Sequence, residues 1–258
     1  MNAQPGTTAV RADGSADSQE HDGLVVADVT VQRAGFDIVR QASLVAPVGR
    51  VTVVLGANGA GKTTLLEAIS GVIPAASGTI ELNGKNLRSL GRRRRALLGL
   101  GHIEQGRRIF GELTTQENIL CAAPRDYDVS EAFALFPELE PRRNVRAVML
   151  SGGEQQMLVI ARALAVRPQI LMVDEMSLGL APLIATRLIT LMRTLADERG
   201  VGVLLVEQFA SLALAAGDHA YVLGDNGRIV YDGSCQTLID SPDILRRAYL
   251  GEEVSPPS

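Results

Sequence analysis

The segment GANGAGKT at residues 56–63 constrains this chain most, because it fits the pattern G-x-x-x-x-G-K-[ST]. The preceding residues 51–55 are β-branched and apolar, which predicts a buried strand, and residues 63–70 predict a helix closed by Gly71. A glycine-rich turn between strand and helix presents backbone N–H groups and a helix N-terminus to an anion. The alternative, a glycine turn with a surface lysine, requires neither strand nor helix. The segment therefore predicts a phosphate-binding loop.

Two acids end a second predicted strand. Residues 169–175, QILMVDE, are apolar until Asp174 and Glu175. Acids at a buried strand end are costly without a task, and they suit a Mg²⁺–nucleotide site beside a phosphate loop. The alternative is a pair of surface acids that ends an ordinary strand.

A second glycine motif, LSGGEQQ, occupies residues 150–156. Ser151 precedes a predicted helix over residues 154–166, so its hydroxyl and the glycine N–H groups form a second anion-binding helix terminus. The alternative is a simple helix N-cap.

The order of predicted elements indicates an α/β fold. Alternating apolar residues over 24–32 and 37–46 predict an antiparallel β-subdomain before the phosphate loop. Strands then alternate with helices, except that residues 111–150 lose the β pattern and predict a helical insertion. Further strands are predicted at 79–82, 98–103, 203–207, 220–223 and 228–231, and further helices at 183–198, 209–216 and 243–249.

Together with Gln105, these motifs resemble the nucleotide-binding domain of ABC transporters over about residues 24–250. Five segments resemble more narrowly the high-affinity F-type ATPase subunit of branched-chain amino acid importers: GRRIF at 106–110, TTQEN at 114–118, SGGEQQM at 151–157, SLGLAP at 177–182 and VEQ at 206–208. The resemblance implies a P-loop NTPase domain over residues 23–250, with a helical subdomain at about 111–165. It also implies ATP and Mg²⁺ as cofactors and ATP hydrolysis as the activity.

The resemblance assigns roles as hypotheses. Glu175 is the expected general base, assisted by Gln105 and Gln208. The expected Mg²⁺ ligands are Thr63, Gln105 and Asp174, the last through a water molecule. The expected ATP-binding residues are Gly56, Ala57, Asn58, Gly59, Ala60, Gly61, Lys62, Thr63, Thr64, Arg33, Ser151, Gly152 and Gly153.

The implied partners follow from the same family. Ser151 and its glycines would hold the ATP of a second ATP-binding subunit, identical or different, so two sites are completed when two subunits close. Gln105 would couple the site to the helical subdomain, which contacts transmembrane permease subunits. An extracytoplasmic solute-binding protein would deliver the cargo. We therefore expect the chain at the cytoplasmic face of the cell membrane.

Four positions depart from the family pattern. Adenine usually stacks on an aromatic residue where this chain has Arg33, with Phe36 nearby, although a guanidinium plane also stacks on a base. Gln208 stands where most ABC ATPases carry histidine, as in related importer subunits. Met176 replaces a common proline, and Ala181 replaces a common aspartate. These changes bring turnover into question more than nucleotide binding.

The sequence lacks the patterns of a membrane-spanning protein, a secreted protein and a metal-binding protein. No run approaches the roughly 20 apolar residues of a membrane helix. Residues 1–22 lack a signal-peptide core and predict a disordered tail, and residues 251–258 are expected to fray.

Cys121 and Cys235 lack metal or disulfide spacing, so reduced thiols are expected. The histidines have no ligand spacing either, which leaves nucleotide-bound Mg²⁺ as the expected metal; they are His21, His102 and His219.

Four consecutive arginines at residues 92–95 predict an exposed helix face. The alternative is a contact with nucleic acid or anionic lipid headgroups, which clustered cations favour. Nucleic acid is not an expected partner, because the net charge is −4 and no aromatic residues interleave with the arginines.

Three functions remain open. The favoured one is the ATPase of a branched-chain or related amino acid importer, with a urea or amide importer as the variant within the same subgroup. The second is a soluble ABC ATPase that does not transport. The third is a regulatory nucleotide-binding subunit that barely hydrolyses ATP.

Overall fold

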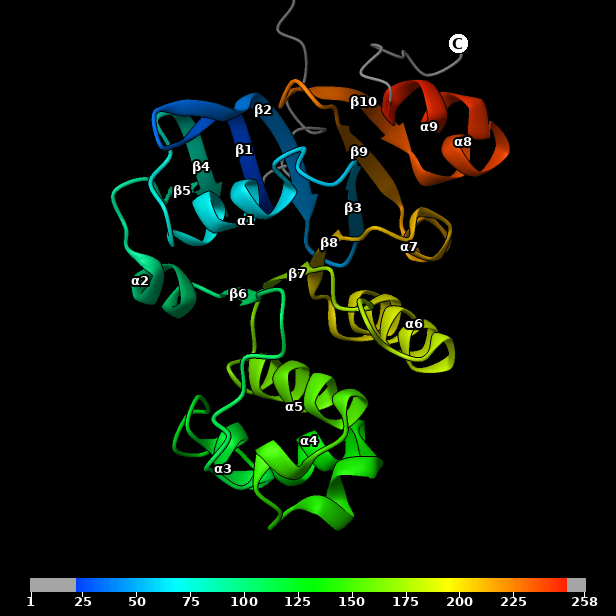
Figure 1. Ribbon diagram of the computed structural model, residues 1–258. Helices are drawn as coiled ribbons and strands as arrows, with labels where there is room; N and C mark the ends of the chain where they lie inside the picture. The colour runs from blue at the N-terminus through cyan, green and yellow to red at the C-terminus, as the bar shows by residue number, and fades with distance from the viewer. Residues whose placement is uncertain (1–21, 250–258) are drawn as a thin grey trace, which may run out of the picture.

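A computed structural model describes residues 22–249 of this chain. The predicted α/β fold is confirmed: two sheets lie on either side of one helix, and a group of helices extends below them (Figure 1). The predicted terminal tails fall outside the described residues, apart from Asp22.

The first sheet is antiparallel, with strand order β2-β1-β4-β5. Leu24 of β1 pairs with Ala46 of β2 on one side and with Leu82 of β4 on the other. All three residues are buried, because alternate side chains of a half-buried strand face the core. The strands are β1 (Gly23–Arg33), β2 (Phe36–Pro47), β4 (Ser77–Leu82) and β5 (Lys85–Asn86); β5 was not predicted.

The second sheet has the order β10-β9-β3-β8-β7-β6, and only β10 runs antiparallel to its neighbour. Every residue of the central strands β3, β8 and β7 is buried, as a parallel sheet covered on both faces requires. The strands are β3 (Val51–Gly56), β6 (Leu100–Ile103), β7 (Ile170–Asp174), β8 (Gly202–Val206), β9 (His219–Leu223) and β10 (Ile229–Ser234).

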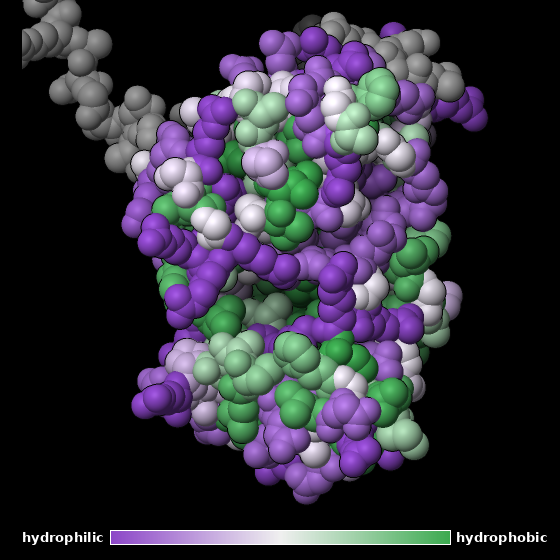
Figure 2. All heavy atoms as spheres, turned by 60° about the vertical axis from the view of Figure 1, so that its left-hand side comes forward, coloured by the Kyte–Doolittle hydropathy of each residue, from purple (hydrophilic) through white to green (hydrophobic). Residues whose placement is uncertain are grey.

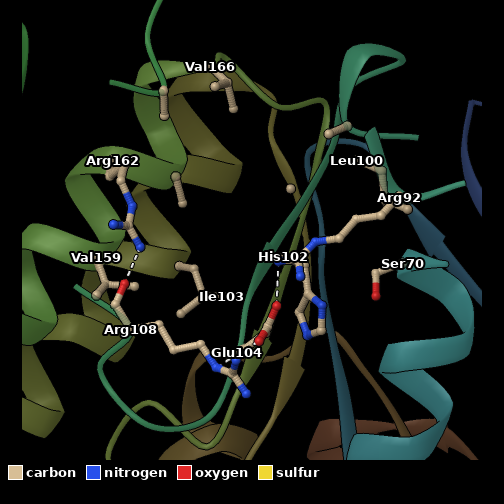
Figure 3. Close-up of a pocket in the computed structure, with 14 residues that line it drawn as sticks. Ser70, Arg92, Leu100, His102, Ile103, Glu104, Arg108, Val159, Arg162 and Val166 are labelled. Atoms are coloured by element: carbon tan, nitrogen blue, oxygen red, sulfur yellow. Dashed lines mark hydrogen bonds and ion pairs between the residues drawn. The ribbon is translucent and has the colours of Figure 1, made fainter. Parts of the chain in front are cut away.

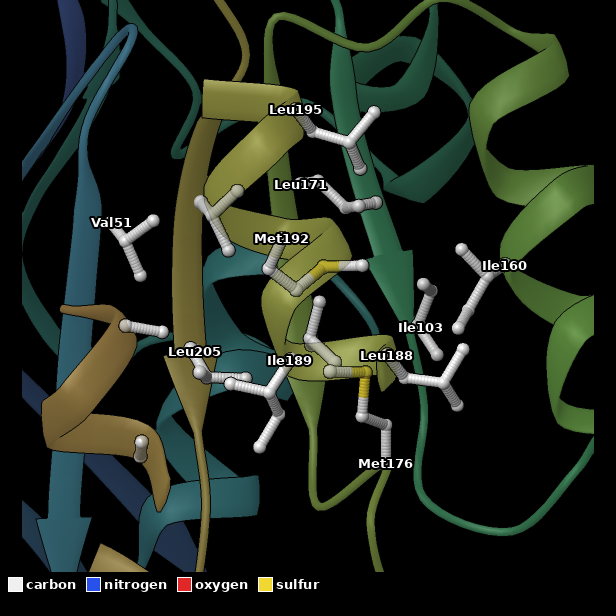
Figure 4. Close-up of a cluster of buried hydrophobic side chains, with 14 of the residues drawn as sticks. Val51, Ile103, Ile160, Leu171, Met176, Leu188, Ile189, Met192, Leu195 and Leu205 are labelled. Atoms are coloured by element: carbon white, nitrogen blue, oxygen red, sulfur yellow. The ribbon is translucent and has the colours of Figure 1, made fainter. Parts of the chain in front are cut away.

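Helices cover both faces of this sheet. α1 (Lys62–Ser70) packs between the two sheets, with Leu65, Leu66 and Ile69 in the same apolar cluster as β1. On the opposite face, Leu188 and Met192 of α6 (Pro182–Arg199) lie against strand residues such as Leu171 (Figure 4). Three further helices follow: α7 (Ala210–Ala216), α8 (Cys235–Asp240) and α9 (Pro242–Tyr249).

The region without β pattern is helical, and it forms the lower part of Figure 1. The helical part continues into α5 (Gly152–Ala165), which contacts both β6 and α3 and so joins this part to the sheet. The shorter elements are α3 (Thr115–Leu120), α4 (Ser130–Leu135), η1 (Pro137–Arg142) and η2 (Ala147–Met149).

The arginine run is only partly the exposed helix face that we predicted. It begins α2 (Arg92–Leu97), and Arg95 is 4% exposed. The Arg95 guanidinium donates to the carbonyls of Ala68 and Ile69 at 2.7 and 2.6 Å, near the C-terminus of α1. The prediction is wrong for Arg95 because carbonyls in the last turn of a helix have no intrahelical partner and need other donors; that of Ala68 also accepts the N–H of Gly71.

Replacing Arg95 with Ala should lower the free energy of unfolding by about 1–3 kcal/mol, because the carbonyl of Ile69 loses its guanidinium donor and that of Ala68 keeps only the N–H of Gly71. The exposed neighbour Arg94 provides the matched control, and Arg94→Ala should change stability by less than about 0.5 kcal/mol. Urea denaturation of both variants measures the difference. Equal effects would contradict the capping role of Arg95.

Candidate active site

The phosphate loop joins β3 to α1 at the carboxyl edge of the parallel sheet (Figure 1). Gly61 precedes α1 with φ +106°, a conformation that favours glycine. A Cβ on Gly56 would lie 2.4 Å from the carbonyl oxygen of Leu223, so this position also requires glycine. Among the described residues, no side chain caps the N-terminus of α1. Its first N–H groups are therefore available to an anion.

Lys62 lies within the loop and is 5% exposed. Its ammonium group donates to the carbonyls of Gly56 and Ala57, at 2.8 and 3.1 Å. Its Nζ atom is also 3.7 Å from Oε1 of Glu175. The loop thus holds a buried cation beside a carboxylate from the neighbouring part of the sheet.

A cleft of about 450 Å³ opens above this loop. Gln105 donates from Nε2 to the second carboxylate oxygen of Glu175 at 2.9 Å, and Gln208 lines the same cleft. Loops that follow three different strands thus bring the three predicted catalytic side chains together. The complete lining is Ile38, Asn58, Gly59, Gly61, Lys62, Thr63, Thr64, Gln105, Glu175, Leu178 and Gln208.

Asp174 lies beneath the cleft and is 1% exposed. Neither of its carboxylate oxygens has a hydrogen-bond partner among the residues that the structure describes. Burial raises the pKa of Asp174 from 3.8 to about 6; the Thr63 hydroxyl and Lys62 oppose the increase, and Glu175 adds to it. A buried carboxylate without a hydrogen-bond partner among the described residues, next to a threonine hydroxyl, fits an oxygen-ligated cation.

The remaining predicted ligands do not line this cleft. Ala60 is buried in the loop, and Gly56 and Ala57 contact Lys62 through their carbonyls. Arg33 is half exposed and forms a close ion pair with Glu67 of α1. Phe36 is 74% exposed.

Ser151, Gly152 and Gly153 lie at the start of α5, outside the cleft. Ser151 forms a capping box: its hydroxyl accepts the N–H of Glu154, and the Glu154 carboxylate accepts the N–H of Ser151. The hydroxyl proton of Ser151 and the first-turn N–H groups remain as donors. The start of α5 therefore offers donors away from the cleft above the phosphate loop.

Sequence reasoning missed Arg107, which connects three loops. Its guanidinium donates to the carbonyl of Gly179 at 3.0 Å, in the segment after Glu175. A Cβ on Gly152 would lie 2.6 Å from the same guanidinium, so Arg107 packs directly on the start of α5. Its sequence signals were its membership of the segment GRRIF and its place two residues after Gln105, but neither gave it a role in the site.

A second hollow lies between the sheet and the helical part, with apolar residues on the helical rim in Figure 2. Arg92, Arg108 and Arg162 surround it, and Glu104 contacts both Arg92 and Arg108 (Figure 3). His102 lies at its wall with both ring nitrogens unpartnered among the described residues, and burial lowers its pKa to about 4. We name this hollow the subdomain groove. Glu104 connects it directly to Gln105 of the active site.

A phosphate loop with a buried lysine, facing a carboxylate held by glutamine, defines a P-loop nucleotide hydrolase. Residues 39–177 match the ABC transporter family. The high-affinity branched-chain amino acid transport ATP-binding protein BraG of Pseudomonas aeruginosa is 43% identical over 209 residues, 79% of this chain and 88% of that protein. The chain therefore belongs to the ABC transporter family, as an ATP-hydrolysing cassette.

Other similar proteins belong to the same family, but their names give different transported substances. The probable branched-chain amino acid transport ATP-binding protein LivF of Archaeoglobus fulgidus is 37% identical over 199 residues, 74% of this chain and 83% of that protein. A crystal structure of the ADP conformation of an ABC transporter cassette gives a TM-score of 0.77 at 25% identity, covering 90% of this chain and 99% of that one. Relatives named for lipopolysaccharide export and phosphonate import also match. Within residues 22–249, no helix has the length and apolarity to cross a membrane.

The raised pKa of Asp174 predicts a pH-dependent effect on stability. Between pH 3.8 and about 6 the folded state binds more protons than the unfolded state, so this carboxyl lowers stability as pH rises and reaches its full cost above pH 6. Asp174→Asn removes that cost. Without nucleotide or metal, the stability of the Asn variant relative to wild type should grow by on the order of 2 kcal/mol from pH 4.5 to 7.5. Urea denaturation at both pH values measures the change, and a pH-independent difference would contradict the raised pKa.

Proposed function

We propose that this chain is the ATP-binding and hydrolysing subunit of an ABC importer for branched-chain or related amino acids. The observation that carries the hydrolytic part is the contact of Glu175 with both Lys62 and Gln105 above the phosphate loop. The relatives named for branched-chain amino acid transport support the substrate class.

In this proposal, Lys62 and the first N–H groups of α1 bind the outer phosphates of ATP. The phosphate oxygens displace the loop carbonyls that Lys62 contacts in the structure. Glu175 accepts a proton from the attacking water, and Gln105 and Gln208 orient that water or the γ-phosphate. The backbone from Asn58 to Thr64 completes the phosphate cradle.

The donor set also fits Mg²⁺, with Thr63, Gln105 and Asp174 as its ligands. Asp174 fits because its buried oxygens lack partners, and the described residues contain no group of three or more acids, histidines or cysteines that could hold a metal without nucleotide. A bound Mg²⁺ would neutralise the charge that develops on the phosphates.

The site requires a second ATP-binding subunit, either a copy of this chain or a different one. Ser151, Gly152 and Gly153 carry free donors but do not line the chain's own cleft, so we assign them to the γ-phosphate held by the partner. Arg33 would stack on adenine after it leaves Glu67, with Phe36 as the nearby alternative.

We place the transmembrane permease contact at the subdomain groove. The groove joins the helical part to Glu104, which precedes Gln105, so a permease segment seated there reaches the active site through one residue. The proposal places the chain at the cytoplasmic face of the cell membrane and leaves cargo recognition to a solute-binding protein outside the membrane.

The experiment is affinity purification of Glu175→Gln in ATP from detergent-solubilised membranes of the native host, with mass spectrometry of co-purifying proteins. Loss of the base should trap the ATP-bound closed state, so two permease subunits and a second ATPase should be recovered. Lys62→Ala is the matched control: it should lose ATP affinity and recover the second ATPase at least about tenfold less well.

Three outcomes would redirect the assignment. Ribosomal or DNA-bound proteins without membrane subunits would contradict a transport role. Permeases whose solute-binding protein binds urea or an amide would move the cargo within the same subgroup. Permeases of an exporter, without any solute-binding protein, would contradict import.

A further inference from the structure

Glu207 is a buried carboxylate directly behind the active site. It follows β8 and is 0% exposed. One of its oxygens accepts the N–H of Ser177 at 3.1 Å, and the other accepts the Ser177 hydroxyl at 2.5 Å. Burial raises the pKa of Glu207 by desolvating its charged form. A carboxylate is costly to bury, and both oxygens of this one form hydrogen bonds to Ser177. This indicates that Glu207 serves to hold Ser177 in a fixed position.

Ser177 belongs to the turn that carries Glu175. Glu175 has φ +45°, a left-handed conformation that costs a non-glycine residue free energy and persists only where surrounding contacts hold it. The backbone N–H of Glu175 donates to the carbonyl of Val206 at 2.9 Å. Met176, between the two polar residues, is 2% exposed and lies in the apolar core (Figure 4). The turn is therefore held at three successive residues.

Two of the three contacts that hold this turn are hydrogen bonds to residues at the end of β8. The next residue along that segment is Gln208. Val206 binds the backbone of Glu175, Glu207 binds Ser177, and Gln208 lines the nucleotide cleft. A displacement of Gln208 therefore acts on the turn that aims Glu175, since both are attached to Glu207.

We propose that Glu207 is a positioning residue for hydrolysis. Through Ser177 it fixes the turn that directs the Glu175 carboxylate towards Lys62 and Gln105, and it links that turn to Gln208. The inference rests on the proposed function, because it requires Glu175 to act on the attacking water. The role depends on the two hydrogen bonds, so an isosteric side chain that keeps both should preserve it.

The test compares kcat and KM for ATP in the assembled transporter for three variants. Glu207→Leu removes both acceptors at similar volume, and Ser177→Ala removes one donor. Glu207→Gln keeps both contacts, because its amide oxygen accepts the N–H and its amide group donates to the Ser177 hydroxyl. We expect kcat to fall roughly 10- to 100-fold in Glu207→Leu and roughly tenfold in Ser177→Ala, with KM within about threefold of wild type. Glu207→Gln should keep kcat within about threefold of wild type.

Hydrogen exchange gives a second readout. With ATP bound, the amides of residues 175–178 should exchange faster in Glu207→Leu than in Glu207→Gln. Unchanged kcat in Ser177→Ala and Glu207→Leu would overturn the proposal. So would losses of kcat and KM that merely follow a lowered Tm, because these indicate a structural role alone. If Glu207→Leu does not fold, the kcat of Ser177→Ala tests the proposal, since this substitution removes a single oxygen atom. A wild-type complex without ATP turnover would contradict the proposed function instead.

Discussion

The alignment of three parallel strands is the constraint on which the site depends. In the pairing of these strands, Val206 of β8 lies opposite Val54 of β3 on one side and Asp174 of β7 on the other. The three strands therefore end at one edge, and the loops that leave them carry Lys62, Glu175 and Gln208. A slip of one residue would turn each strand's side chains to the opposite face and move Asp174 out of the site. Such a slip would also disturb the packing on both faces of the sheet, because every residue of these strands is buried.

Sequence alone predicted the parts of the site that have local causes. A strand, a glycine turn and a helix are adjacent in the chain, so the phosphate loop and the end of α1 at Gly71 agree with the prediction. The burial of Arg95 was mispredicted because its partners are carbonyls of a distant helix. Glu207 carried the same signal as Asp174, an acid at the end of an apolar strand, but its partner Ser177 is known only from the fold. The pairing of Arg33 with Glu67 is likewise a long-range contact.

In the proposed importer, the two helix termini that we assign to phosphate belong to different ATP sites, so one chain supplies only half of a working unit. The N-terminus of α1 opens into the cleft with Glu175, whereas that of α5 lies outside it and carries Ser151 on the helical part. In this proposal, a movement of the helical part relative to the sheet would shift the second terminus. Gln105 contacts Glu175 and adjoins Glu104 of the subdomain groove, so the same movement would reach the Glu175 carboxylate. In the proposed importer, nucleotide state and permease state are coupled through this short path.

Single-turnover hydrolysis of radiolabelled ATP by the native subunit in its assembled membrane complex tests the central claim most directly. The proposed site predicts that bound ATP is converted to ADP and phosphate in a Mg²⁺-dependent step, that EDTA blocks this step, and that added transport substrate with its binding protein accelerates it. Tightly bound ATP that is recovered intact, with or without Mg²⁺ and substrate, would contradict a transport engine and favour a regulatory nucleotide-binding subunit.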